Sequence, residues 1–298
     1  SIRIPAACCG LVGLKPTRGR IPVGPDFGEP LHGLGVELVV SRTVRDTAAA
    51  LDAVEGPGIG DRYVIPRPRR PYLAEIGRKP KRLRIAFSAA VDSHSDAPDP
   101  VCVQTVKAAA ERCRELGHRV VEGAPAYDAD AFHRGNLIFW ASFCTAAIAG
   151  TAQMLGRQPS PDNLEASLCA NYQYGLTLKA LDLEVADALM NQTSRAVAPF
   201  FERYDVLLTP TMGVPPLKLG VLNANDPRLD AQGWYDLVFR YMPYTALYNM
   251  TGQPAISLPL GQSPDGLPIG VQAVARYGDE ATLLALAAQL EEAMPWRG

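Results

Sequence analysis

The side chains that could take part in covalent catalysis gather within the first twenty residues. Ser1 offers a hydroxyl, Lys15 an amine, and Arg3 and Arg20 two guanidinium groups. A serine becomes a strong nucleophile only when a base removes its proton, and a lysine acts as that base only when its surroundings lower its pKa. The residue types alone do not indicate catalysis, since a lone Ser-x-Arg is common. Evidence for a catalytic site must come from the spacing of these residues.

That spacing follows a long motif. Ser-Ile-Arg-Ile-Pro-Ala at Ser1–Ala6 continues as Gly-Leu-Val-Gly-Leu-Lys-Pro-Thr at Gly10–Thr17 and ends in Gly19-Arg20. The segment is similar to the signature of the amidase-signature family, in which Gly-Gly leads into Ser-Ile-Arg-x-Pro-Ala. About a dozen fixed positions in twenty match, so the chain resembles the C-terminal part of such an enzyme, beginning at the nucleophilic serine.

Further blocks match the family in the same order along the chain. Ser41–Asp46 resembles its helix-opening segment, Tyr204–Thr211 its late core strand, and Thr251–Pro259 with Gly266–Gln272 its C-terminal hairpin. The least family-like part is a mostly helical insert at about 129–204. We therefore expect residues 1–298 to form the C-terminal part of a single amidase-signature domain.

The resemblance implies a Ser–Ser–Lys hydrolase of carboxamides, and also of esters or carbamates. Ser1 matches the nucleophile, and its backbone N–H belongs to the oxyanion hole. The bridging serine and the base lysine lie upstream in the family. Lys15 belongs to the Lys-Pro-Thr block, which the family does not use as its base. The chain starts at Ser1 without a Met, as a cut or processed end would. We expect it to be inactive alone and stable only with the missing N-terminal part bound.

Three other functions are open at this stage. An N-terminal-nucleophile hydrolase would use the amine of Ser1 as its base, but it needs the serine on a strand of a four-layer sandwich, and Ile2–Gly10 is a poor strand. A Ser-His-Asp hydrolase would need a G-x-S-x-G elbow, which the chain lacks, and no histidine has an acidic residue in triad-like placement. A non-catalytic subunit with an amidase-like fold is the third.

Substrate contacts are predicted from position alone. Phe27 lies in the loop after the motif, Phe139 and Trp140 in the variable helical region, and Thr211 at the end of a core strand. These four are the candidate pocket residues, and the aromatic content indicates a small-molecule amide with an apolar or aryl acyl group. Arg3 and Arg20 are expected to hold the loop.

The composition of the chain argues against several classes of binding partner. The net charge of -2 and pI near 6.1 argue against nucleic acid. By inspection, no apolar run approaches the ~18–20 residues of a membrane span, so no membrane is expected. The six cysteines lack zinc spacing and suit free thiols in the cytoplasm. We expect no metal and no cofactor, and the sequence allows a homodimer.

The order of the predicted strands and helices indicates an α/β fold, and the resemblance implies a mixed twisted β-sheet flanked by α-helices on both faces. The helix at Glu280–Ala293 is expected to cover one edge of the sheet. Residues 1–35 are expected to be loop-rich. Helices are predicted over Thr43–Val54, Asp99–Leu116, part of Pro227–Met250 and Glu280–Ala293, and strands over Leu83–Phe87, His118–Glu122, Asp205–Thr209, Pro254–Pro259 and Gly270–Val274.

Overall fold

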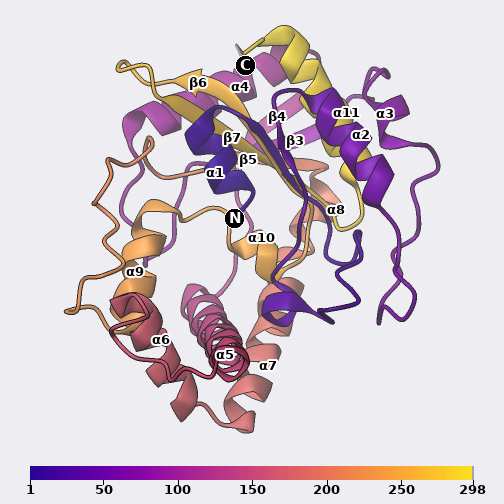
Figure 1. The fold of residues 1–298 in the computed structure, drawn as a ribbon. Coiled ribbons are helices and arrows are strands. Elements are labelled where there is room, and N and C mark those ends of the chain that lie inside the picture. The colour runs from indigo at the N-terminus through magenta and orange to yellow at the C-terminus, as the bar shows by residue number, and fades with distance from the viewer. Residues whose placement is uncertain (297–298) are drawn as a thin grey trace.

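The computed structural model describes residues 1–296, in which a seven-stranded sheet lies between two groups of helices (Figure 1). The strand order is β2-β1-β6-β7-β5-β3-β4. β3 is parallel to β4 and β5, and the other neighbours are antiparallel, so the sheet is mixed as predicted. The strands are β1 (Val12–Lys15), β2 (Val40–Ser41), β3 (Arg84–Phe87), β4 (Arg119–Glu122), β5 (Val206–Pro210), β6 (Ala255–Gln262) and β7 (Pro268–Ala275).

The two faces of the sheet differ because side chains alternate along each strand. On β7, Val271 and Ala273 belong to one hydrophobic core, whereas Val274 belongs to the core on the other face. Gln272 also alternates with Val271 and Ala273 and is fully buried. A buried glutamine in a core strand needs hydrogen-bond partners, and these turn out to lie beside Ser1.

One face of the sheet is covered by α2 (Val44–Val54), α4 (Pro100–Glu115) and α11 (Glu280–Ala293), with the short α3 (Tyr72–Glu75) beside them. Thr43 and Asp99 cap α2 and α4 by accepting hydrogen bonds from Asp46 N and Val101 N, which satisfies free N–H groups of the first turn. The prediction that α11 covers a sheet edge is wrong. Its leucines are buried in the core over this face, and the helix contacts β6 and β7, which are inner strands of the sheet.

The other face carries the helical region, α5 (Ala129–Leu155), α6 (Ala166–Thr177), α7 (Ala180–Val197), α8 (Phe200–Arg203), α9 (Ala231–Tyr241) and α10 (Leu247–Met250). Phe132, Phe200 and Tyr248 bury their rings in the core on this side, together with Leu207 and Val274 of the sheet. In Figure 1 these helices project away from the sheet, and the N-terminus lies between the two parts.

The first 35 residues hold more regular structure than expected. α1 (Arg3–Cys9) precedes β1, and a 3-10 turn, η1 (Pro30–Gly33), follows. Pro5 and the two cysteines disguise the helix in the sequence. Pro5 is tolerated because it lies in the first turn, where its missing N–H would have no partner within the helix. Gly10 ends the helix with a left-handed φ of 68°.

Helix α5 corrects the statement that no apolar run approaches membrane length. No charged residue lies between Leu137 and Leu155, and by length and composition α5 could cross a bilayer, with 22% of its most apolar window buried. The run is rich in Ala, Gly and Thr, which hid its length. Here α5 packs against α6, α7 and η1, and a packing helix of a globular domain meets the same criteria.

Candidate active site

The position of Ser1 is set by two glycines in the sheet. A side-chain carbon on Gly13 of β1 would lie 2.6 Å from Ala6 Cβ, and one on Gly270 of β7 would lie 2.7 Å from Ala7 Cβ. Helix α1 therefore rests directly on the strands, with Ala6 and Ala7 buried. The tight contact fixes α1, and with it Ser1, which lies at its N-terminal end.

Ser1 borders a cavity of about 410 Å³ between α1 and the helical region. Arg3 and Lys15 line it from the side of the motif, Asn136 and Trp140 from α5, and Tyr235 from α9. The first N–H groups of a helix have no partner within it, so those at the start of α1 are free to donate, and Ser1 lies two residues before Arg3, where the helix begins. The cavity thus combines a serine, two buried basic side chains and apolar walls.

Arg3 is buried, and its hydrogen-bond partners among residues 1–296 are uncharged. Its guanidinium donates to Gln272 Oε1 and, over 2.5 Å, to Asn249 Oδ1. Burial lowers the pKa of Arg3 to about 9, because an ion loses its hydration when it leaves water. Arg3 therefore holds α1 to β7 and α10, as expected for a residue that fixes the loop, and it also lines the cavity.

Lys15 comes closer to Ser1 than the sequence indicated. Its Nζ donates to Pro16 O over 2.8 Å, and the side chain lines the same cavity as Ser1. Burial lowers the pKa of Lys15 well below its ordinary value, and the charges of Arg3 and Arg18 lower it further. The hydrogen bond to a backbone carbonyl is that of a residue that fixes the loop, and the lowered pKa makes Lys15 a candidate base as well.

The rest of the motif is locked to helix α11. Arg20 pairs with Glu280 over 3.2 Å, both side chains being buried, and Glu280 Oε1 also accepts from Thr17 N over 2.8 Å. Arg18 donates to the carbonyls of Gly33 and Asn249. These contacts hold the loop in place, in agreement with the role predicted for Arg20.

The four predicted pocket residues separate in the structure. Trp140 lines the cavity beside Ser1. Phe139, its neighbour on α5, points into a buried cluster and stacks on His32 at 4.8 Å between ring centroids. Phe27 is 57% exposed, and Thr211 is fully buried, where its hydroxyl contacts Ser257 Oγ at 2.8 Å. Adjacent helical residues point about 100° apart, which allows Trp140 to face the cavity while Phe139 faces the buried cluster.

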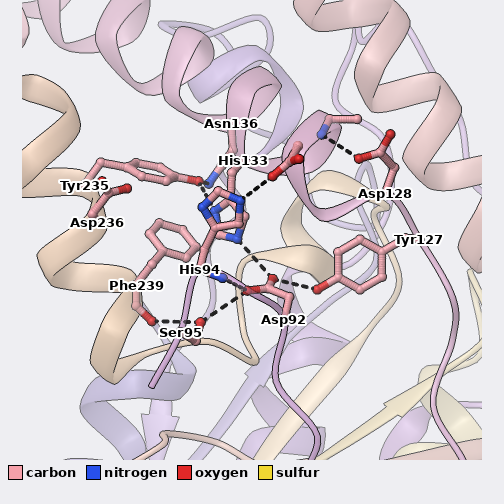
Figure 2. A network of polar contacts seen from close by, with 12 residues as sticks. Asp92, His94, Ser95, Tyr127, Asp128, His133, Asn136, Tyr235, Asp236 and Phe239 are labelled. Atoms are coloured by element: carbon pink, nitrogen blue, oxygen red, sulfur yellow. Dashed lines mark hydrogen bonds and ion pairs between the residues drawn. The ribbon is translucent and has the colours of Figure 1, made fainter. Parts of the chain in front are cut away.

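Histidines do have acidic partners, contrary to the sequence analysis. His133 Nε2 lies 3.0 Å from Asp92 Oδ2, and His94 Nε2 lies 2.7 Å from Asp130 Oδ1 (Figure 2). The second nitrogen of His133, however, contacts the hydroxyl of Tyr235 at 3.0 Å. Among the described residues that line the cavity with Ser1 there is no histidine. The pairs therefore form no triad with Ser1.

Sequence reasoning also missed Asn136, Tyr235 and Asn249, which line the cavity. They come from three separate helices and carry no local motif. In α5, Asn136 directly precedes the apolar stretch that begins at Leu137, and it is fully buried. A buried polar side chain in an apolar helix face is itself an indication of a site.

Comparisons with known proteins agree with this geometry. A family model described as Amidase matches residues 1–284. The chain is 36% identical over 308 residues to a 6-aminohexanoate-cyclic-dimer hydrolase of Pseudomonas sp. (strain NK87), covering 99% of this chain and 62% of that protein. It is 34% identical to a putative amidase AmiC of Mycobacterium leprae (strain TN), covering 99% of this chain and 60% of that protein.

Solved structures show the same fold. A structure of 6-aminohexanoate cyclic dimer hydrolase complexed with substrate matches with a TM-score of 0.89 at 33% identity, covering 99% of this chain and 63% of that one. A bacterial aryl acylamidase matches with a TM-score of 0.79 at 21% identity, covering 99% and 61%, which is a likeness of fold alone. The chain thus spans about three fifths of the length of the curated relatives it matches.

Proposed function

Because this chain belongs to the amidase family, we propose that it carries the nucleophile, Ser1, of an enzyme that hydrolyses the C–N bond of a carboxamide. The observation that carries the proposal is the position of Ser1. It lies at the end of a helix fixed against the sheet, at the border of a 410 Å³ cavity that Arg3 and Lys15 also line. The motif that places it there lies within the residues that the family model matches.

In the proposed reaction, Ser1 Oγ attacks the amide carbon and the carbonyl oxygen becomes an oxyanion held by backbone N–H groups at Ser1. Loss of one such donor costs about 10²–10³ in rate in well-studied hydrolases. The serine proton passes to the leaving nitrogen, the amine departs, and water hydrolyses the acyl-enzyme. We propose that a second serine and a lysine from a preceding segment carry the proton, as the resemblance implies.

Lys15 is the alternative base, favoured by its buried place in the same cavity and its lowered pKa. A base in this position would need a path for the proton between Nζ and Ser1 Oγ. Its hydrogen bond to Pro16 O instead indicates a role in fixing the loop. Labelling of a Lys15→Met variant tests this alternative, because Ser1 that is still labelled at the wild-type rate cannot depend on Lys15 as its base.

The proposed substrate is a small amide whose bulk fills the cavity. Trp140, Trp234 and Val238 give it apolar walls, which supports the apolar or aryl group predicted from the sequence. Esters and carbamates present an acyl carbon to the same serine, so we propose them as further substrates. A cytoplasmic location stays a prediction.

The test is covalent labelling with a fluorophosphonate probe, read by intact mass and peptide mapping. We expect label on Ser1 in the active enzyme and none in Ser1→Ala. Ser194→Ala, a change of the same kind on the distant helix α7, is the control and should label as the wild type does. Absence of label on Ser1 in a preparation that folds would favour the non-catalytic alternative.

A further inference from the structure

Asn136 stands out at the wall of the cavity because half of its amide has no partner. Its Nδ2 donates to Tyr235 Oη over 2.8 Å. Its Oδ1 is buried and, within residues 1–296, accepts no hydrogen bond. The residue is fully buried, yet it borders the cavity shared with Ser1. Buried polar atoms without partners are rare because they are costly, so this oxygen calls for a ligand.

A chain of hydrogen bonds decides which atom of the Asn136 amide is free (Figure 2). Asp92 Oδ2 accepts from Tyr127 Oη over 2.9 Å and lies 3.0 Å from His133 Nε2. Burial alone would raise the pKa of Asp92, but the hydrogen bonds and charge of His133, with Tyr127, outweigh it and lower the pKa to about 2. The carboxylate is therefore ionised, and His133 Nε2 must carry a proton to donate to it.

The second nitrogen of His133, Nδ1, lies 3.0 Å from the hydroxyl of Tyr235. The hydroxyl oxygen of Tyr235 accepts from Asn136 Nδ2, since only the N–H side of that amide can supply a proton. Oδ1 is then the atom left without a partner, on a residue that lines the cavity.

The charges around the cavity select the ligand that this acceptor can take. Arg3 and Lys15 line the cavity, and none of its other described lining residues is Asp or Glu. An ammonium group would meet two basic side chains without a carboxylate to balance it. An uncharged donor, such as a carboxamide N–H or a hydroxyl, meets no such penalty.

We propose that Asn136 Oδ1 accepts a hydrogen bond from a neutral N–H or O–H on the part of the substrate that fills this cavity. Asn136 is then a specificity-determining residue, and the preferred substrate is an amide that carries a second hydrogen-bond donor. Tyr235, His133 and Asp92 are positioning residues that hold the amide in its orientation. This inference rests on the proposed function. It changes the expected acyl group of the substrate from a purely apolar one to an apolar chain that carries one hydrogen-bond donor.

The experiment compares two p-nitroanilides that differ at one atom. One carries an N-acetyl-6-aminohexanoyl group, and the other an 8-oxononanoyl group, in which CH₂ replaces the second N–H. A series of chain lengths allows for the span between Ser1 and Asn136. We expect kcat/KM to favour the N–H substrate by about 5- to 150-fold at the optimal length, the range set by one unsatisfied buried acceptor.

Variants assign that preference to the residue. Asn136→Leu should reduce it to within about twofold, mainly by losing activity on the N–H substrate. Tyr235→Phe keeps the ring but releases the amide, and should reduce the preference part of the way. Asn191→Leu, the same change at an exposed site on α7, should retain the wild-type preference. A variant at a buried position can fail to fold. If Asn136→Leu does not fold, Tyr235→Phe still tests the inference.

Calorimetric binding of the two product acids, N-acetyl-6-aminohexanoate and 8-oxononanoate, separates this inference from the proposed function. If no anilide is cleaved but the first acid binds more tightly in an Asn136-dependent way, the proposed function fails and the acceptor site stands. If both anilides are cleaved equally and both acids bind equally, an ordinary water satisfies Asn136. The inference is then overturned while the proposed function stands.

Discussion

At the scale of single residues, the surroundings of Ser1 are notable for buried basic groups that lack carboxylate partners. Arg3 is held by two side-chain amides and Lys15 by one backbone carbonyl. Burying a cation in this way is unfavourable unless its pKa falls, and the pKa values of both residues are lowered. These buried basic groups therefore lower the free energy of unfolding, and the effect can be measured.

The titration of Lys15 makes the stability of the protein depend on pH. Its pKa is lower in the folded protein than its ordinary value of 10.5, so between the two values the unfolded chain binds more protons and stability rises with pH. We expect Lys15→Met to remove up to about 1.4 kcal/mol per pH unit from that slope. Urea unfolding of both proteins from pH 7 to pH 9.5 measures it. Parallel slopes would mean that Lys15 titrates normally.

The residues of the motif could be predicted from the sequence because they are contiguous. Ser1, Arg3 and Arg20 lie where twenty consecutive residues place them, and Arg20 binds the loop as expected. Asn136 and Tyr235 could not be predicted, since their meaning depends on two helices meeting 99 positions apart. Phe27 and Phe139 could not be placed from the sequence either, because residue type alone does not show whether an aromatic side chain lies in the core, in a pocket or at the surface.

At the scale of elements, the contact between α1 and the sheet is the most sensitive feature. Gly13→Ala would place a methyl group 2.6 Å from Ala6 Cβ and 2.9 Å from Ile2 O, so α1 must shift. We expect a loss of about 1–3 kcal/mol in stability and a lower rate of probe labelling at Ser1. Gly123→Ala has no atom within 4 Å of its added carbon and is the control. Equal labelling of both variants would mean that α1 does not fix Ser1.

The loop after β3 joins the sheet to α5 and α9 through Asp92. Its pKa of about 2 lies below the ordinary 3.8, so its interactions contribute stability that is present above pH 4 and lost as the pH falls through 2. The difference corresponds to about 2 kcal/mol. We expect Asp92→Asn to be less stable by about that amount at pH 7 and equal to the wild type near pH 2. Denaturant unfolding at several pH values tests this.

The sequence predicted elements well where local signals agree. α2, α4 and α11 each have a cap and a helical stripe, and α11 has the predicted bounds. Helix α1 escaped detection because seven residues around Pro5 give no periodicity. Its existence depends on tertiary contacts with Gly13 and Gly270, which no local pattern contains.

At the scale of the whole molecule, apolar surface gathers near strand β2 at one edge of the sheet. Val39, Val40 and Val54 are 44–47% exposed, and a groove of about 520 Å³ lies between the segment that precedes this strand, α2 and the loop after Arg18. Sheet edges and apolar grooves of this kind tend to acquire partners.

The mixed sheet was predicted from the sequence, but the order of its strands was not. The register between strands that are distant in the sequence is set by the assembled core.

This surface leads to a prediction about the 298-residue chain expressed alone. We expect it to bind a hydrophobic dye and to aggregate on heating, because the edge and the groove are open to solvent. Dye fluorescence and light scattering during thermal unfolding measure both. Cooperative unfolding without aggregation would show that the chain is self-sufficient.

The pairing of Thr17 and Arg20 with Glu280, and of Arg3 with Gln272, has a consequence for the time at which the nucleophile is formed during synthesis. Ser1 and its loop are translated more than 250 residues before the partners that order them. The loop should stay as sensitive to protease as an unfolded peptide in a chain that ends before Gln272, and become resistant once α11 has emerged. A growing chain would then hold Ser1, the proposed nucleophile, in an unordered loop until α11 has been translated.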